Sequence, residues 1–235
     1  MFVTPSVSVV IPWRSDDPER TEIFRWCLHR WGSLTDYRII TPNDGQTEGP
    51  FNRSKAVNRG VALAAGDDVV IVSDADTAVI HGQPEAMIAA LQQGANWVIG
   101  YSRFVHLAQV ATREVLASPI DIVLPSNPRG PSVRYASWES VCGLWAMRTE
   151  DYHLSGGNDE GFEGWGSEDT AFAMKADTLL GKHERLPGVG LHLFHGLRPD
   201  RKTDASARAN YERLGRYEKA AGDPEAMTAL VRESL

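Results

Sequence analysis

Short apolar runs alternate with stretches of helical spacing in this chain, and this alternation constrains its fold more than any other feature. The runs that are expected to form strands in the first half lie at residues 7–12, 37–41, 68–73 and 96–101. The first helix is expected to begin with Asp17 as N-cap and Pro18 in its first turn. Strands that alternate with helices form a mainly parallel sheet with helices on both faces. The sequence therefore predicts an α/β sandwich, and ligands of such sheets bind beyond the carboxyl ends of the strands.

The second half of the chain is less regular. Residues 117–135 are rich in proline and predict a long surface loop. Strands are expected at residues 140–148 and 189–196, a helix at 168–181 that ends at a glycine, and an amphipathic helical tail from Ala205 onward that serves packing only.

Composition excludes several classes of protein. The net charge of -7 over 235 residues argues against nucleic acid or an anionic membrane as the main partner. No apolar run approaches the ~18 residues of a membrane span, and the N-terminal run, which Pro12 interrupts, lacks the basic start of a signal peptide. We therefore expect a cytoplasmic protein with two free cysteines. Motifs of phosphate-loop NTPases, dinucleotide-binding folds, zinc proteases and serine hydrolases are missing from the sequence.

Two carboxylates, Asp74 and Asp76, follow the apolar run at residues 69–73 directly, with one alanine between them. On a strand their side chains would face the same way, and two like charges at one place need a cation between them. His192 and His195 follow another predicted strand, and carboxylates with imidazoles suit manganese-type ions better than calcium. The alternatives are solvated turns or helix caps for the acids and local hydrogen bonds for the histidines.

A glycine-rich segment at residues 155–167 precedes a second candidate group. Trp165 lies between two glycines, and an exposed tryptophan is costly in a segment that only connects two elements. Flat aromatic faces beside carboxylates suit sugar rings, whose hydroxyls donate to the acids. Glu168 and Asp169 follow Ser167 at the expected start of a helix, whose dipole keeps Asp169 ionised, as a general base requires. Simple capping of that helix is the alternative.

Basic and aromatic side chains are expected at the same edge of the sheet. Phe51, Arg53 and Lys55 stand at the start of a predicted helix, where the helix end attracts phosphate and Phe51 suits stacking on a nucleobase. Trp13 and Arg14 follow the first strand at that edge. Three further cations suited to anionic phosphates, or to a solvated surface, follow the last strand: Arg198, Arg201 and Lys202.

Together these motifs resemble those of the GT-A-fold glycosyltransferases, and most closely those of the β-1,4-galactosyltransferase family. The resemblance covers about residues 6–203 in the family's order, and it is carried by VVIPWR, FNRSKAVNRGV, VIVSDADT, CGLWAM, GFEGWGSED and HLFH. It implies a three-layer α/β/α sandwich with a mainly parallel central sheet. It also implies one domain over residues 1–235, with a nucleotide-binding half at 1–100, an acceptor-binding and catalytic half at 101–204 and a helical tail at 205–235.

The resemblance implies a role for each matching acid and histidine. Asp76, His192 and His195 would hold Mn²⁺ or Mg²⁺, while Asp74 would support the metal and the ribose or sugar of the donor. Asp169 would be the catalytic base. Many family members have a methionine at the position of His192, so this histidine is a departure from the family pattern.

The remaining matches imply contacts to the substrates. Glu168 would bind sugar hydroxyls, and Trp165 would lie under the donor and acceptor sugars. Five residues would hold the uridine nucleotide of a UDP-sugar: Pro12, Trp13, Arg14, Phe51 and Arg53.

The implied activity is metal-dependent, inverting transfer of a hexose of galactose, N-acetylgalactosamine or glucose type to an acceptor hydroxyl of a glycan, protein or lipid. A retaining enzyme similar to polypeptide N-acetylgalactosaminyltransferases is the first alternative. A non-catalytic sugar- or nucleotide-binding module would keep the aromatic residues but has no need of the Asp-x-Asp motif. A calcium-stabilised protein would not need two histidines, and a nucleotide-sugar pyrophosphorylase would have a glycine-rich basic loop near its N-terminus.

Overall fold

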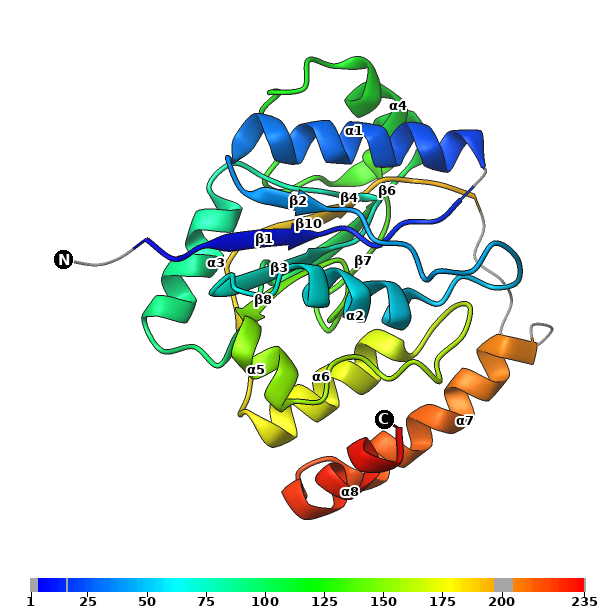
Figure 1. Cartoon of the computed structure of the whole chain (residues 1–235). Coiled ribbons are helices and arrows are strands. Elements are labelled where there is room, and N and C mark those ends of the chain that lie inside the picture. Colours follow the sequence, from blue (N-terminus) through cyan, green and yellow to red (C-terminus); the bar gives the residue numbers. More distant parts are fainter. Residues whose placement is uncertain (1–3, 16, 197–204, 235) are drawn as a thin grey trace.

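A six-stranded sheet forms the centre of the molecule (Figure 1) in the computed structural model, which describes residues 4–15, 17–196 and 205–234. The strand order is β2-β1-β3-β8-β5-β9, with bounds β1 Val7–Val10, β2 Arg38–Ile40, β3 Val69–Ser73, β5 Trp97–Ile99, β8 Leu144–Arg148 and β9 Glu184–Arg185. β8 is antiparallel to its neighbours β3 and β5, and the other pairs are parallel. All strands of this sheet except β8 therefore run in one direction, as predicted.

Helices cover both faces of this sheet. α1 (Pro18–Leu34) lies along one face, whereas α2 (Arg53–Leu63), α5 (Thr149–Leu154) and α6 (Glu168–Leu179) lie along the other (Figure 1). α3 (Gln83–Gln92) packs against β5 and β8. The predicted three-layer sandwich is confirmed, and Asp17 caps α1 by accepting a hydrogen bond of 2.9 Å from the backbone N–H of Arg20.

A second sheet of four strands has the order β4-β10-β6-β7. Its strands are β4 (Thr77–Ala78), β6 (Arg103–Leu107), β7 (Val133–Ser137) and β10 (Val189–His192). The predicted loop over residues 117–135 was wrong at both ends, because α4 (Gln109–Ala117) reaches its first residue and β7 takes up its last three. β7 is an edge strand that faces solvent along most of its length, so its sequence lacks the apolar run of a buried strand.

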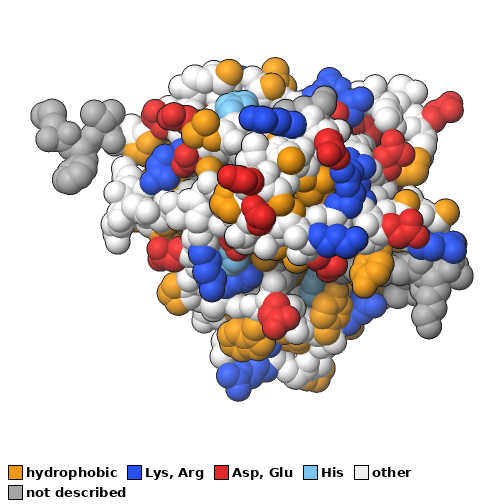
Figure 2. All heavy atoms as spheres, turned by 90° about the horizontal axis from the view of Figure 1, so that it is seen from below, with side chains coloured by type: hydrophobic (Ala, Val, Ile, Leu, Met, Phe, Trp, Pro, Cys, Tyr) orange, Lys and Arg blue, Asp and Glu red, His pale blue; other side chains and the backbone are white. Residues whose placement is uncertain are grey.

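The helical tail consists of α7 (Ala205–Ala220) and α8 (Pro224–Ser234), and both pack against α6 on the outer side of the molecule. Acidic and basic side chains alternate over the face seen from below, and hydrophobic side chains form only small groups on it (Figure 2). Within the described parts of the chain, we find no helix that combines the length and the apolar character needed to cross a membrane.

The core is built on the central strands. Every residue of β1 and β3 is buried, as expected for strands that are covered on both faces. Trp31 of α1, Trp97 of β5 and Trp145 of β8 are fully buried in the same cluster. This rigid centre fixes the strand ends, and the candidate site lies beyond those ends.

Candidate active site

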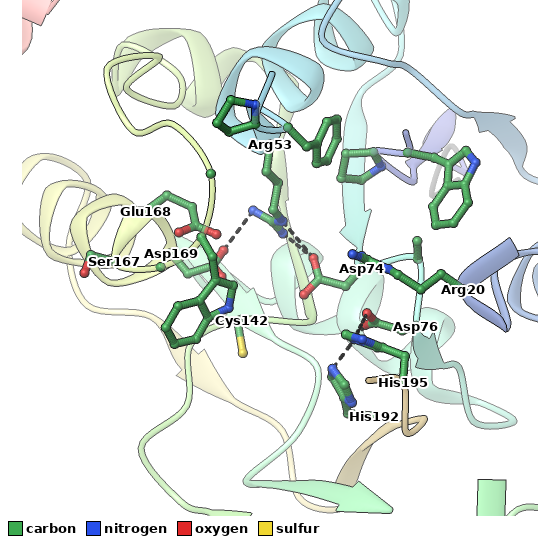
Figure 3. A pocket seen from close by; sticks show the side chains of 18 of the residues that line it. Arg20, Arg53, Asp74, Asp76, Cys142, Ser167, Glu168, Asp169, His192 and His195 are labelled. Atoms are coloured by element: carbon green, nitrogen blue, oxygen red, sulfur yellow. Dashed lines mark hydrogen bonds and ion pairs between the residues drawn. The ribbon is translucent and has the colours of Figure 1, made fainter. Parts of the chain in front are cut away.

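A cavity of about 690 Å³ opens where the parallel strands end (Figure 3). It collects residues from both halves of the chain. Twelve of the predicted site residues line it: Pro12, Trp13, Arg14, Phe51, Arg53, Asp74, Asp76, Trp165, Glu168, Asp169, His192 and His195. Lys55 in α2, which was predicted to lie near phosphate, is not among the residues that line it.

The two acids after β3 lie in a turn and not in a strand. β3 ends at Ser73, and the backbone N–H of Thr77 closes the turn on the carbonyl of Asp74 at 3.1 Å. The expectation that strand geometry aims both carboxylates at one spot was therefore wrong. Asp74 and Asp76 line the same cavity, but their carboxylates contact different partners.

Asp76 lies beside both predicted histidines. The antiparallel pairing of β4 with β10 sets His192 opposite Thr77, and the N–H of Leu193 donates to the carbonyl of Asp76 at 2.8 Å. Nε2 of His195 is 2.9 Å from Oδ2 of Asp76, and Nε2 of His192 is 3.5 Å from its Oδ1. Ligand atoms of these three side chains all lie within 4.8 Å of one another.

The chemistry of this group fits a divalent cation. Oδ1 of Asp76 is buried and accepts no hydrogen bond, which is a costly state for a carboxylate oxygen unless a cation contacts it. Burial alone would raise the pKa of Asp76, but His192 and His195 outweigh it and hold that pKa below its ordinary range. One carboxylate with two imidazoles is a donor set that suits manganese and related ions.

Asp74 is bound instead by Arg53, at the start of α2. Nε and Nη2 of Arg53 donate to Oδ1 of Asp74 at 2.9 and 2.5 Å, and Nη1 lies 2.9 Å from Oδ1 of Asp169 without the alignment of a hydrogen bond (Figure 3). Only 12% of the Arg53 side chain is exposed. Burial opposes its charge, but Asp169 and Asp74 raise the pKa of Arg53 above its ordinary value. The guanidinium therefore joins two acids from opposite sides of the cavity.

Asp169 stands in the first turn of α6, next to a strained residue. Ser167 has a φ of 74°, which lies in the left-handed region. Among the described residues, no other residue apart from glycines has a positive φ. Its side chain makes no capping hydrogen bond, so simple serine capping does not explain this segment. Burial raises the pKa of Glu168, although Arg53 opposes this effect. Backbone strain beside paired acids is typical of functional sites.

The segment that carries Trp165 is held from two sides. The N–H of Gly164 donates to the carbonyl of Phe51 at 3.2 Å. Nδ2 of the buried Asn210, in α7, donates to the carbonyls of Glu163 at 2.8 Å and of Trp165 at 3.4 Å. The tail therefore does more than pack, because α7 fixes the backbone on which Trp165 stands.

The residues predicted to hold a nucleotide line the same cavity. Trp13 stacks on Phe24 with ring centroids 4.3 Å apart. Arg14 lies 5.7 Å from the centre of the Phe51 ring, and it donates to the carbonyls of residues 46, 48 and 49 at 2.8–3.2 Å. Arg14 therefore shapes the loop next to Phe51, a contribution that the sequence pattern does not reveal.

The sequence-based prediction missed several residues of the cavity, and Arg20, Ser140 and Cys142 are among them. Arg20 of α1 points toward Asp74 and Asp76 (Figure 3), and its position in the first turn at the same sheet edge was the available signal. Ser140 and Cys142 also line the cavity, with Oγ and Sγ 2.9 Å apart, and burial raises the pKa of the Cys142 thiol. The predicted phosphate-binding cations lie outside the described residues: Arg198, Arg201 and Lys202.

The chain is similar to known glycosyltransferases in one segment and in its fold. A family model described as the N-terminal domain of galactosyltransferase matches residues 128–195. The sequences of curated proteins give no match. Because the matched segment contains β8, the start of α6 and β10, it covers the part of the cavity with Glu168, Asp169 and both histidines.

Solved structures extend the similarity to most of the chain. A Drosophila β-1,4-galactosyltransferase 7 mutant in complex with manganese, UDP-Gal and xylobiose is 16% identical with a TM-score of 0.51, over 77% of this chain and 65% of that one. The catalytic domain of the same Drosophila enzyme with xylobiose is 15% identical with a TM-score of 0.54, over 89% and 81%. Glucosyl-3-phosphoglycerate synthase from Mycobacterium tuberculosis, in complex with Mn²⁺, UDP and phosphoglyceric acid, is 13% identical with a TM-score of 0.53, over 93% and 79%. The chain therefore has the GT-A fold of these glycosyltransferases, and its resemblance to the β-1,4-galactosyltransferases is confirmed.

Proposed function

We propose that this chain is a metal-dependent glycosyltransferase that moves a hexose from a UDP-sugar to an acceptor hydroxyl with inversion. One observation carries the proposal: a single cavity holds a cation-type cluster at Asp76 and, across Arg53, a second acid at Asp169. The fold supports it, since similar structures include complexes with manganese and UDP-Gal and with Mn²⁺ and UDP.

Asp76, His192 and His195 are the proposed metal ligands. A divalent ion bound there supplies positive charge that stabilises the diphosphate as it leaves the sugar. Residues 1–100 provide most of the proposed donor site, with Phe51 against the base and the N-terminus of α2 near the phosphates. Arg20 adds a further cation at that place.

Asp169 is the proposed base. Its carboxylate takes the proton of the acceptor hydroxyl while the hydroxyl oxygen bonds to the anomeric carbon and the bond from that carbon to the diphosphate breaks, so that UDP leaves. Such general base catalysis contributes about 10²–10⁴-fold to the rate. Arg53 holds Asp169 in position through their ion pair of 2.9 Å. A base on the acceptor side fits one in-line displacement, and hence inversion.

Trp165 and Glu168 complete the proposed sugar site. The indole offers an apolar face to the sugar rings, and the carboxylate of Glu168 accepts hydrogen bonds from hydroxyls. Asn210 positions this wall of the site through its bonds to the backbone on either side of Gly164.

A panel of UDP-sugars tests the proposal. The purified chain is mixed with UDP-galactose, UDP-glucose or UDP-N-acetylgalactosamine, with manganese or with a chelator, and thermal shift and release of UDP are followed. We expect one donor to raise the melting temperature and to release UDP only with manganese. If no donor acts on the wild type, or if release is the same with chelator, the chain is not this enzyme. Donor binding without any turnover would favour a non-catalytic binding module.

A further inference from the structure

A second hollow of about 570 Å³ lies outside the cavity described above. It forms where β6 and β10 begin and β7 ends, and the register of these strands sets Arg103 beside Val189. Arg103, Arg129 and Trp138 line it, together with Asn127 and other small or polar residues, and none of the lining residues is acidic.

Trp138 gives this groove an exposed aromatic surface. Its side chain is 66% exposed, the only tryptophan among the large hydrophobic residues on the described surface. The guanidinium carbon of Arg103 lies 5.9 Å from the centre of the indole ring. An indole ring that is exposed to solvent buries apolar surface when a flat ligand stacks on it, and a neighbouring cation supports such a stack.

The two arginines of the groove lack an acidic counterpart. Nη1 of Arg103 and Nε of Arg129 donate to the same oxygen of Asn127, at 2.9 and 3.4 Å. Among the residues that the structure describes, neither arginine forms an ion pair with a carboxylate, whereas Arg53 and Arg213 do. Two guanidinium groups that converge on one neutral oxygen leave uncompensated positive charge in a protein of net charge -7.

A short strip of chain links the groove to the proposed active site. Trp138 is followed directly by Glu139 and Ser140, which line the main cavity. Arg185 holds this strip by donating to the carbonyls of Ser140 at 2.7 Å and of Glu139 at 3.3 Å. A ligand that extends from the main cavity across this strip would meet Trp138 first.

We infer that this groove binds an acidic part of a saccharide acceptor, with a sugar ring on Trp138 and carboxylates of the hexuronic acid type on Arg103 and Arg129. This inference rests on the proposed function, since it assigns the chemical class of the acceptor. Guanidinium groups pair with planar carboxylates through two parallel hydrogen bonds. A free anion would not need the indole, and a neutral sugar would not need the two arginines.

The test measures binding without donor or manganese, so that it does not depend on transfer. The ligands are a galacturonic acid tetrasaccharide, its carboxyl-reduced neutral counterpart and inorganic phosphate, each titrated into the whole chain by calorimetry. The variants are Arg103→Gln, Arg129→Gln and Trp138→Ala. Controls are Arg113→Gln on α4 and Tyr211→Ala on α7, which remove an exposed cation and an exposed ring elsewhere.

We expect the acidic tetrasaccharide to bind the wild type at least about tenfold more tightly than its neutral counterpart, and each groove variant to lose about tenfold or more, as for hydrogen bonds to charged groups. The two control variants should bind as the wild type does. Equal binding of the two tetrasaccharides, equal losses in the controls, or competition by inorganic phosphate at the same concentration would overturn the inference.

The two proposals fail in different ways. If the acidic saccharide binds through the groove but no UDP-sugar supports transfer, the proposed function is refuted. The groove then remains a binding site for acidic saccharides. If sugar transfer proceeds and the groove variants bind and react as the wild type does, the proposed function stands. The inference that the groove binds an acidic saccharide is then refuted.

Discussion

Arg53 and Asp169 form an ion pair of 2.9 Å across the cavity, and the same guanidinium is bonded to Asp74. The acid that follows β3 and the acid at the start of α6 are therefore held by one mostly buried cation. The two acids would repel each other without Arg53, so this residue ties together the two walls of the proposed site.

Removal of this cation should destabilise the protein. We expect Arg53→Met to lower the free energy of unfolding by about 3–5 kcal/mol, because it removes the cation that pairs with two mostly buried carboxylates. The matched control is Arg216→Met, whose ion pair with Glu233 is exposed and should cost at most about 1 kcal/mol. Urea denaturation measures both. Equal losses in the two variants would show that Arg53 does not join the two walls.

The metal site should depend on Asp76 far more than on Asp74. Asp76→Asn removes the charge on the ligand oxygen and should weaken binding of manganese alone by at least about tenfold. Asp74→Asn is the matched control and should change this affinity little, because the carboxylate of Asp74 is bonded to Arg53. Titration of manganese followed by electron paramagnetic resonance gives both constants. A larger loss of manganese affinity in Asp74→Asn than in Asp76→Asn would show that Asp74 is the main metal ligand.

Lys175 should make stability depend on pH. It is almost fully buried, and burial lowers its pKa to about 8, although Asp159 opposes this effect. Below pH 8 both the folded and the unfolded chain hold the proton, so the folded state carries the full cost of the buried charge. Between pH 8 and about 10.4 the unfolded chain binds more protons, so the stability of the wild type rises with pH.

Lys175→Met lacks this dependence. We expect its free energy of unfolding, relative to wild type, to fall by about 2 kcal/mol between pH 7 and pH 9.5. Denaturation of both proteins at the two pH values measures the change, and other titrating groups cancel in the comparison. A difference that stays constant over this range would mean that Lys175 keeps an ordinary pKa in the fold.

Asn210 should matter to the acceptor although it lies in the helical tail. Asn210→Ala removes the hydrogen bonds that Asn210 donates to the carbonyls of Glu163 and Trp165, at a cost of about 1–3 kcal/mol. We expect a higher KM for the acceptor, because Asn210 fixes the backbone that carries Trp165, the proposed wall of the sugar site. Tyr211→Ala, exposed on the same helix, is the control. Unchanged acceptor kinetics in Asn210→Ala would show that α7 only packs.

Local signals predicted much of the fold. Strands buried on both faces appear as continuous apolar runs, and Asp17 with Pro18 marks the start of α1. β7 could not be predicted, because it is an exposed edge strand whose partner β6 was itself not recognised. The direction of β8 also escaped prediction, since pairing direction depends on the path of the chain and not on the residues of one strand.

The candidate site, like the fold, was predicted from the sequence only in part. Residue types at the strand ends predicted which side chains would line the cavity, since the carboxyl ends of parallel strands meet at one edge. The bridge from Asp74 through Arg53 to Asp169 was not predictable, because it depends on rotamers of side chains that are remote in sequence. Trp138 and Arg103 belong to no motif, and only the structure brings them together.

The central claim is that Asp169 removes the acceptor proton. If Asp169 were only an acid in the first turn of α6, Asp169→Asn would cost about 0.3–1 kcal/mol of stability and leave turnover near normal. As the base, its replacement by Asn keeps the shape of the side chain but abolishes its capacity to accept a proton.

The most direct measurement is therefore the kcat of sugar transfer by Asp169→Asn at saturating UDP-sugar and manganese. The account predicts a fall of at least ~10²-fold, with an affinity for UDP close to that of the wild type. A kcat within a few fold of the wild type would contradict it and remove Asp169 from the mechanism.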